Sequence, residues 1–464
     1  MTGHDRSWSV TATLPLLLGL AVAACDQGLP TAAPADAEAA FSKAGWHELA
    51  QQIRALAAER SITPMPPRPE VRDGLARLGQ MLAFDPVLSG NHDISCMTCH
   101  HPTLATGDAR SLAIGQGGDG LGLARIHPGR EFISRNAPPL FNLHLLDHLF
   151  WDGRVFVDEA GELHTPVGAA LSLDMTAAFE FGALSALGLL PVLSREEMRG
   201  TVGENDLADL PDEEVGEIWA AIMDRLGTID EYRELFEEAY PGTAFEAMTF
   251  AHASNAIAGF FIQAFTFDNS PWDRFLSGNS AALSAEQLEG AFKFMNAPCS
   301  ECHNGPGFSD DDFHNVALAQ FGPGHGNGPS GLDDFGRMNV TGDPDDLYRF
   351  RTTMLRNVEL TAPYGHAGEF QDLALFIDHY SQSADKLRAY SPADVPDPLL
   401  QTTLLTENVE DIIAARDPLI LPVAFDEEFT RQVTAFMLAL TDRRALNLDR
   451  FVPKKVPSGL PVAH

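Results

Sequence analysis

Four of the five cysteines in this 464-residue chain stand in two copies of the motif C-x-x-C-H. The two copies are Cys96-Cys99-His100 and Cys299-Cys302-His303. In such a motif two thiols can form thioether bonds with haem vinyl groups, and the adjacent histidine can ligate the iron. Structural zinc would need two close cysteine pairs, and a thioredoxin-like redox pair would need neither the histidine nor a second copy. The duplicated motif therefore predicts two covalently bound haem c groups.

The fifth cysteine, Cys25, follows an N-terminal segment with the features of an export signal. Arg6 precedes an apolar run over residues 14–24 that is too short for a stable membrane span, and small residues stand just before Cys25. We expect residues 1–24 to be a lipoprotein-type signal peptide and Cys25 to carry a lipid that holds the protein on a membrane. The alternative is ordinary cleavage nearby, which would leave Cys25 as a free thiol. Either alternative predicts the periplasm or cell envelope.

The chain is strongly acidic, with 31 basic and 65 acidic residues and a formal net charge of −34. This charge argues against nucleic acid and anionic lipid surfaces as partners. It favours encounter with a basic electron-transfer protein, although the solubility of an exported acidic protein would explain it as well.

Predicted helices and the long loops between them must position the two motifs. The pattern predicts a mostly α fold with two cytochrome c-like haem domains, long loops and little β structure. We expect a tether and N-terminal helix over residues 25–66, with the helix itself from about residue 36 to 60. An N-terminal haem domain would follow over residues 67–243, a C-terminal haem domain over residues 244–451, and a tail over residues 452–464.

The segments around both motifs resemble the bacterial dihaem cytochrome c peroxidases and their MauG-type relatives. The similar segments, in family order, are Leu82-Ala83-Phe84-Asp85-Pro86-Val87-Leu88-Ser89-Gly90, Arg135-Asn136-Ala137-Pro138-Pro139, Phe150-Trp151-Asp152-Gly153-Arg154, Asn304-Gly305-Pro306-Gly307-Phe308-Ser309-Asp310 and Leu355-Arg356-Asn357-Val358-Glu359-Leu360-Thr361-Ala362-Pro363-Tyr364. The resemblance covers residues 68–443.

The resemblance implies that the N-terminal haem, on His100, reacts with peroxide. Its distal acid would be Glu197, and a carboxyl group over an apolar haem face has a raised pKa suited to proton transfer near neutral pH. Some relatives close this haem with a histidine, and Gln116 stands at that histidine's place. Because glutamine is a poor iron ligand, we expect an open, high-spin haem. The alternatives are a surface role for Glu197, and iron ligation by His101 or His127.

The C-terminal haem, on His303, would store and relay electrons. Compact members give it a distal methionine, whereas MauG-type relatives have a tyrosine. On the helix expected near residues 370–380, Tyr380 shares a face with apolar residues and His379 points away from it. We therefore expect Tyr380 to be the distal ligand of this iron. A core tyrosine is the alternative, and Met338 and Met354 are weaker candidates.

The remaining family positions lie between the two haems. The resemblance implies that Trp151 bridges the haems and that Arg351 takes part in their communication. It also implies an interdomain calcium site at Asn136, Thr361 and Pro363, with much of the ligation by backbone carbonyls.

The expected function is a peroxidase that reduces hydrogen peroxide to water with electrons from a small cytochrome or cupredoxin. The electrons would pass from the C-terminal haem to the N-terminal haem. The alternatives are a MauG-type oxidant that modifies a partner protein, and a non-catalytic dihaem electron carrier. A homodimer is compatible with the sequence, and no nucleic acid partner is expected.

Overall fold

The structure, a computed structural model, describes residues 43–129, 131–420 and 423–463. The predicted signal peptide, Cys25 and the first part of the predicted tether and helix, up to residue 42, lie outside the described residues. From Trp46 onward the described chain forms one compact unit. Within the described ranges, no helix is long and apolar enough to cross a membrane.

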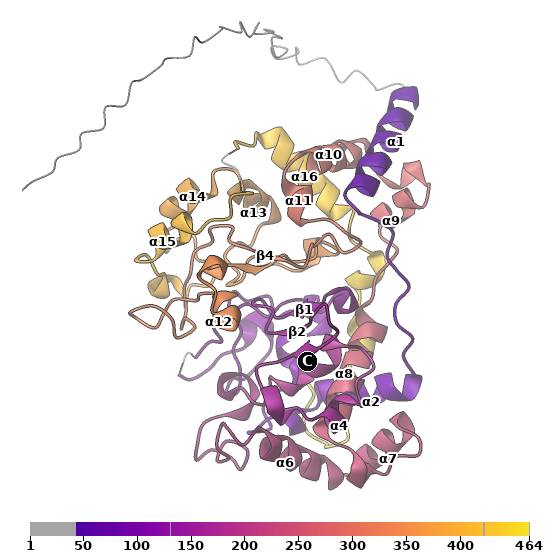
Figure 1. Ribbon diagram of the computed structural model, residues 1–464, viewed down its shortest axis with the longest axis vertical. Helices are drawn as coiled ribbons and strands as arrows, with labels where there is room; N and C mark the ends of the chain where they lie inside the picture. Colours follow the sequence, from indigo (N-terminus) through magenta and orange to yellow (C-terminus); the bar gives the residue numbers. More distant parts are fainter. Residues whose placement is uncertain (1–42, 130, 421–422, 464) are drawn as a thin grey trace, which may run out of the picture. The chain divides into compact units, whose positions relative to one another are not determined.

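Helices joined by long loops make up most of the fold (Figure 1). The helices are α1 (Lys43–Glu59), α2 (Asp73–Phe84), α3 (Cys96–Cys99), α4 (Leu173–Thr176), α5 (Ala183–Ala186), α6 (Val215–Gly227), α7 (Asp230–Ala239), α8 (Phe250–Phe265), α9 (Pro271–Leu276), α10 (Ala285–Asn296), α11 (Cys299–Cys302), α12 (Met338–Thr341), α13 (Leu373–His379), α14 (Ser383–Ala389), α15 (Val409–Ala414) and α16 (Glu427–Leu438). The two haem motifs coincide with the short helices α3 and α11.

The β structure is confined to two small antiparallel sheets. The first sheet has the order β1 (His148–Leu149), β2 (Val155–Val157) and β3 (Leu163–His164), and the second pairs β4 (Phe313–His314) with β5 (Phe350–Arg351). In the second sheet Phe313 lies opposite Arg351, so the pairing joins segments that are far apart in the chain. The prediction of a mostly α fold with little β structure is confirmed.

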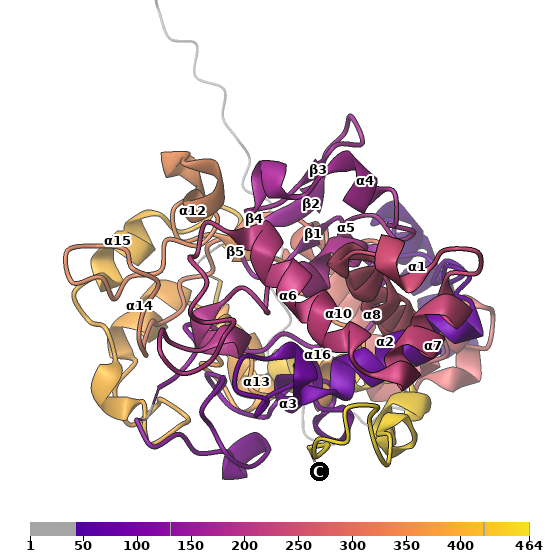
Figure 2. The same ribbon diagram turned by 90° about the horizontal axis from the view of Figure 1, so that it is seen from below.

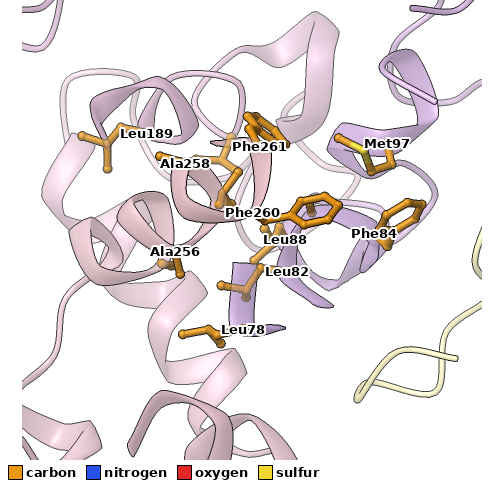
Figure 3. Packing of buried hydrophobic residues seen from close by; sticks show 14 of the residues in the cluster. Leu78, Leu82, Phe84, Leu88, Met97, Leu189, Ala256, Ala258, Phe260 and Phe261 are labelled. Carbon is orange, nitrogen blue, oxygen red and sulfur yellow. The ribbon is translucent and has the colours of Figure 1, made fainter. Parts of the chain in front are cut away.

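The first core packs around α8, a helix whose side chains are buried on nearly all sides. The amphipathic helix α2 covers it with Leu75, Leu78 and Leu82, and Figure 3 shows Leu78 and Leu82 in one cluster with Ala256 and Phe260 of α8. A Cβ atom on Gly79 would lie 1.8 Å from the carbonyl oxygen of Ala256. The helices can therefore approach this closely only because residue 79 is glycine.

The second core contains α1, α9, α10 and α16, and α10 and α16 lie side by side (Figure 2). Helix α10 begins at a capping box, in which Ser284 Oγ accepts from Gln287 N and Ser284 N donates to Gln287 Oε1. At the centre of this core the rings of Trp272 and Phe436 pack edge to face, with centroids 5.1 Å apart. This core supports the second haem motif.

The two hydrophobic cores do not follow the predicted boundary between the haem domains at residue 243. Helix α8 follows that position in sequence yet buries its side chains in the first core, whereas α1 packs in the second. The segment predicted as a C-terminal tail also packs on the first core, where Val456 and Val462 are buried. The division into haem domains stays a prediction.

Candidate functional site

The first haem motif forms the single helical turn α3, which places both thiols and the histidine together. Ser95 and Thr98 cap the turn reciprocally, and Ser95 N donates to Thr98 Oγ1 over 3.0 Å. His100 N closes the turn on the carbonyl of Cys96 at 3.0 Å. Because side chains three positions apart share a helix face, Cys96 and Cys99 can both reach one macrocycle.

The histidines of both motifs are oriented in the same way by a backbone carbonyl. His100 Nδ1 lies 3.2 Å from the carbonyl oxygen of Thr106, and His303 Nδ1 lies 3.0 Å from that of Phe308. Since a carbonyl only accepts, Nδ1 must carry the proton and Nε2 is left to ligate iron. Burial lowers the pKa of both imidazoles, which favours the neutral form that a metal requires. Both motifs therefore fit haem.

A cavity opens beside the second motif, and most of its lining is apolar, as a pocket for a large apolar group such as haem would be. Cys299, Cys302 and His303 line it. Trp151 and Arg351 line it as well, so both residues predicted to connect the haems border this cavity.

Helix α13 presents its apolar face and Tyr380 to this cavity. Leu373, Phe376 and Ile377 line the cavity together with Tyr380, as the helical period predicts. His379 instead points away, with its Nε2 3.0 Å from the carbonyl of Val316. Burial raises the pKa of the Tyr380 phenol.

Met338 and Met354 were the weaker candidates for the distal ligand of the C-terminal haem, and they differ in position. Met354 borders the same cavity as Tyr380, whereas Met338 is absent from the residues that line it. Iron ligation by Tyr380 stays a prediction.

Glu197 lies in a π-helical turn, Arg195–Arg199. Such turns are frequent at functional sites. Burial raises the pKa of Glu197, the Arg154 guanidinium opposes that effect and Glu196 adds to it. The carboxylate also acts electrostatically on Cys96 and Cys99. The fold thus brings Glu197 to the first haem site, while its neighbour Glu196 is exposed.

Gln116 lies directly against this acidic turn. Its backbone N donates to the carbonyls of Glu196 at 3.2 Å and Glu197 at 3.0 Å, and its side-chain oxygen accepts from Asn91. A Cβ atom on Gly115 would lie 1.8 Å from the Glu196 carbonyl oxygen, so only glycine permits this approach. The loop therefore holds Gln116 beside Glu197.

His101 and His127 were the alternative ligands predicted for the iron of the first haem. Both have other contacts in the structure. His101 contacts Thr103 Oγ1 through Nδ1 and the Ala463 carbonyl through Nε2. The His127 ring lies beside Gly117, and its Nδ1 accepts from Gly129 N over 3.0 Å.

The segment 150–154 touches both haem sites. The Trp151 indole is buried and donates to the carbonyl of Asn136 over 2.8 Å, while its own carbonyl accepts from Arg351 N over 2.9 Å. Arg351 also donates through Nε to the carbonyl of Phe150 over 3.2 Å. Three residues beyond Trp151, Arg154 stacks on the Phe150 ring at 3.9 Å and is the cation that acts on Glu197. The segment therefore borders the second cavity through Trp151 and carries the charge that acts on Glu197 through Arg154.

A buried ion cluster fixes this segment. Arg135 bonds Asp152 at 2.6 Å and Asp334 at 2.6 and 2.8 Å. Burial by itself would raise the pKa of Asp334, but the charge and hydrogen bonds of Arg135 outweigh it and hold that pKa below its ordinary value. The sequence analysis missed the roles of Arg135, Asp152 and Arg154, although the resembling segments contain all three.

Asn136, Thr361 and Pro363, the residues predicted to bind calcium, line one small cavity. The Asn136 side chain donates to the carbonyls of Arg110 and Ser111 at 2.9 and 3.2 Å. The fold thus brings the three residues together, and the calcium site stays a prediction.

Comparisons with known proteins show which family this chain resembles. The family model described as "Di-haem cytochrome c peroxidase" matches residues 73–281. Cytochrome c551 peroxidase of Pseudomonas aeruginosa is 32% identical over 296 residues, which cover 64% of this chain and 68% of the relative. The methylamine utilization protein MauG of Methylorubrum extorquens is 26% identical over 374 residues, or 80% of this chain and 87% of the relative.

A solved structure of a MauG-like protein associated with microbial copper homeostasis has the same fold. It superposes with a TM-score of 0.57 at 24% identity, over 84% of this chain and 95% of that chain.

The ion cluster yields a test of stability. Asp334→Asn should lower the free energy of unfolding by about 3 kcal/mol, because it leaves buried Arg135 with one carboxylate instead of two. Asp345→Asn removes the same charge from an exposed position and is the control. The measurement is urea unfolding of both holoproteins.

The pH dependence of the free energy of unfolding provides a second test of the ion cluster. Since the Asp334 pKa is lowered in the folded state, its contribution is fully present above the unfolded pKa of about 3.9 and is lost as the pH falls below it. The natural protein should therefore lose stability more steeply than Asp334→Asn on acidification. Equal stability of the two Asn variants would contradict this account of the cluster.

Proposed function

The chain belongs to the di-haem cytochrome c peroxidase family, and on that premise we propose that it reduces hydrogen peroxide to water. Two electrons come one at a time from a small cytochrome or cupredoxin, and two protons complete the reduction of one peroxide to two waters. The observation that carries the proposal is the half-buried acid Glu197, which lies beside Gln116 and acts electrostatically on the two cysteines of the first motif.

Haem bound at the two motifs supplies the redox-active iron. Glu197 takes a proton from the inner oxygen of peroxide and returns it to the outer oxygen, so that the outer oxygen leaves as water. The raised pKa of Glu197 suits both halves of this transfer near neutral pH. Gln116 cannot close the site as a histidine would, which leaves room for peroxide from the start.

The second site has the character of an electron store. With haem bound at His303, Tyr380 would be the residue that ligates its iron on the other side, where a phenolate would stabilise the ferric state, and the apolar residues of α13 would keep water away. Trp151 carries electrons from this site to the first, and Arg351 holds the Trp151 backbone in place. The calcium that we propose at Asn136, Thr361 and Pro363 links the halves on either side of this route.

The setting of the reaction follows from the same premise. We propose that residues 1–24 direct export, that Cys25 anchors the protein through a lipid, and that the enzyme works in the periplasm or cell envelope. The net charge of −34 favours a basic donor. A homodimer is compatible with this arrangement.

One observation favours a second function. Tyr380 at the second cavity and Gln116 at the first site both resemble the MauG-type pattern, and a MauG covers most of this chain. Stored oxidising equivalents could then modify a partner protein. The third possibility, a non-catalytic electron carrier, gives no role to the half-buried Glu197.

The test of the distal acid is Glu197→Gln, with the exposed neighbour as its control. Loss of the proton shuttle should slow peroxide reduction by about 10²–10⁴-fold while both haems stay attached. Glu196→Gln removes the same charge one residue away and should keep the rate. Stopped-flow kinetics with peroxide measures both, and equal rates in the two variants would remove Glu197 from the mechanism.

The test of the distal tyrosine is Tyr380→Phe, with Tyr364→Phe as the control because both phenols border the same cavity. Loss of a phenolate ligand should raise the midpoint potential of the C-terminal haem and change its ferric absorption spectrum. Tyr364→Phe should leave both unchanged. An unaltered spectrum and potential in Tyr380→Phe would show that another group faces this iron.

A further inference from the structure

The chain beyond the second core returns to the first haem site as a strap, residues 452–463. Val456 and Val462 are buried in the first core, and Leu460 packs against it. Just before the strap, the carbonyl of Phe451 accepts from Gln80 Nε2 of α2 over 2.8 Å. In Figure 2 the end of the strap lies beside α3, the turn of the first haem motif.

A buried carboxylate anchors the middle of the strap. Asp85 is fully buried and accepts from Ser458 Oγ at 2.6 Å, Ser458 N at 3.2 Å and Tyr232 OH at 2.7 Å. It also accepts from Val87 N at 3.0 Å. Hydrogen bonds to a charged acceptor are stronger than neutral ones. Ser458 is thus the point at which the strap is tied to the segment leading into the haem motif.

The far end of the strap reaches the residue next to the proximal ligand. His101 Nδ1 accepts from the backbone N of Thr103 at 3.3 Å, so the proton of this imidazole is on Nε2. His101 Nε2 lies 3.3 Å from the carbonyl oxygen of Ala463. The strap carbonyl therefore accepts a hydrogen bond from His101, a buried side chain.

Backbone hydrogen bonds continue from His101 to the ligand itself. The carbonyl of His101 accepts from Thr106 N at 2.9 Å, and His101 N donates to Gly107 O at 2.9 Å. The carbonyl of Thr106 is the group that accepts from His100 Nδ1 at 3.2 Å. Displacing His101 would therefore displace the acceptor that orients His100.

We propose that the strap is a positioning element for the proximal histidine of the N-terminal haem, acting through His101 and Thr106. A hydrogen bond from Nδ1 makes the imidazole a stronger donor to iron, which stabilises the ferric state. Loosening the strap weakens that hydrogen bond and raises the midpoint potential of this haem. The C-terminal haem is positioned by the carbonyl of Phe308 and stays unaffected. The inference needs haem on His100 and does not depend on peroxide reduction.

Ser458 and Tyr232 provide a matched pair of variants, because each donates one hydroxyl hydrogen bond to Asp85 and only Ser458 belongs to the strap. The measurement is a spectroscopic redox titration of the holoprotein, which reports both haems, together with hydrogen exchange of residues 101–107. Ser458→Ala should raise the N-terminal midpoint potential and speed exchange in that loop. Tyr232→Phe should change neither, and Ser458→Thr, which keeps the hydroxyl, should retain the natural values.

The loss of one hydrogen bond in Ser458→Ala could leave the strap in place. A second strap variant, Val462→Ala, therefore removes buried apolar contact, and its redox titration is carried out in parallel. An upward shift confined to the N-terminal haem in either strap variant supports the proposal. An unchanged N-terminal potential in both strap variants overturns it. So does a shift of equal size in Tyr232→Phe, or one shared by both haems, because either would reflect general loosening of the first core. Peroxide is absent throughout, so failure of the proposed function would not affect the result.

Discussion

The buried ion cluster of Arg135 with Asp152 and Asp334 is the constraint on which the relation between the two haem sites depends. Asp152 lies in the segment shared by both sites, and Asp334 lies far along the chain in the second half. A buried guanidinium with two carboxylates tolerates little displacement, since any movement leaves a charge unpaired in a poorly solvated interior. The cluster therefore fixes Trp151 at the second cavity and Arg154 near Glu197. In the function that we propose, one short segment therefore serves both electron transfer and proton transfer.

The two sites become unequal because different elements cover their distal sides. Near the first motif, a π-helical turn and the loop of Gly115 and Gln116 pack against each other through backbone hydrogen bonds, and the turn carries the half-buried Glu197. Over the second motif, α13 supplies an apolar face that ends in Tyr380. The proximal sides are alike, with a histidine oriented by a carbonyl in both. The different roles that we propose for the two haems therefore arise from the elements near each motif: the π-helical turn and the Gln116 loop at the first, and α13 at the second.

Local pattern predicted much of this arrangement. The spacing of Cys96, Cys99 and His100 predicted the haem-binding turn, and the helical period predicted which face of α13 borders the cavity. The resemblance directed attention to Trp151 and Glu197, which lie at the two sites although their roles stay predictions.

Pairings between distant residues escaped the sequence analysis for a physical reason. The bonds of Arg135 to Asp334 and of Ser458 to Asp85 join segments hundreds of residues apart in the chain, and neither periodicity nor spacing carries that information. From the sequence, the strap was predicted only as a tail, because a short segment rich in proline has no helical or strand period. Helix α8 was assigned to the second half because sequence order alone does not reveal which core a helix joins.

The central claim is that the N-terminal haem is open from the start and the C-terminal haem is closed. Electron paramagnetic resonance of the resting ferric protein and of the half-reduced protein, each with and without hydrogen peroxide, tests it most directly. The account predicts a high-spin N-terminal haem already in the resting state, a low-spin C-terminal haem, and loss of the high-spin signal on addition of peroxide. Two low-spin haems in both redox states, with no response to peroxide, would contradict it.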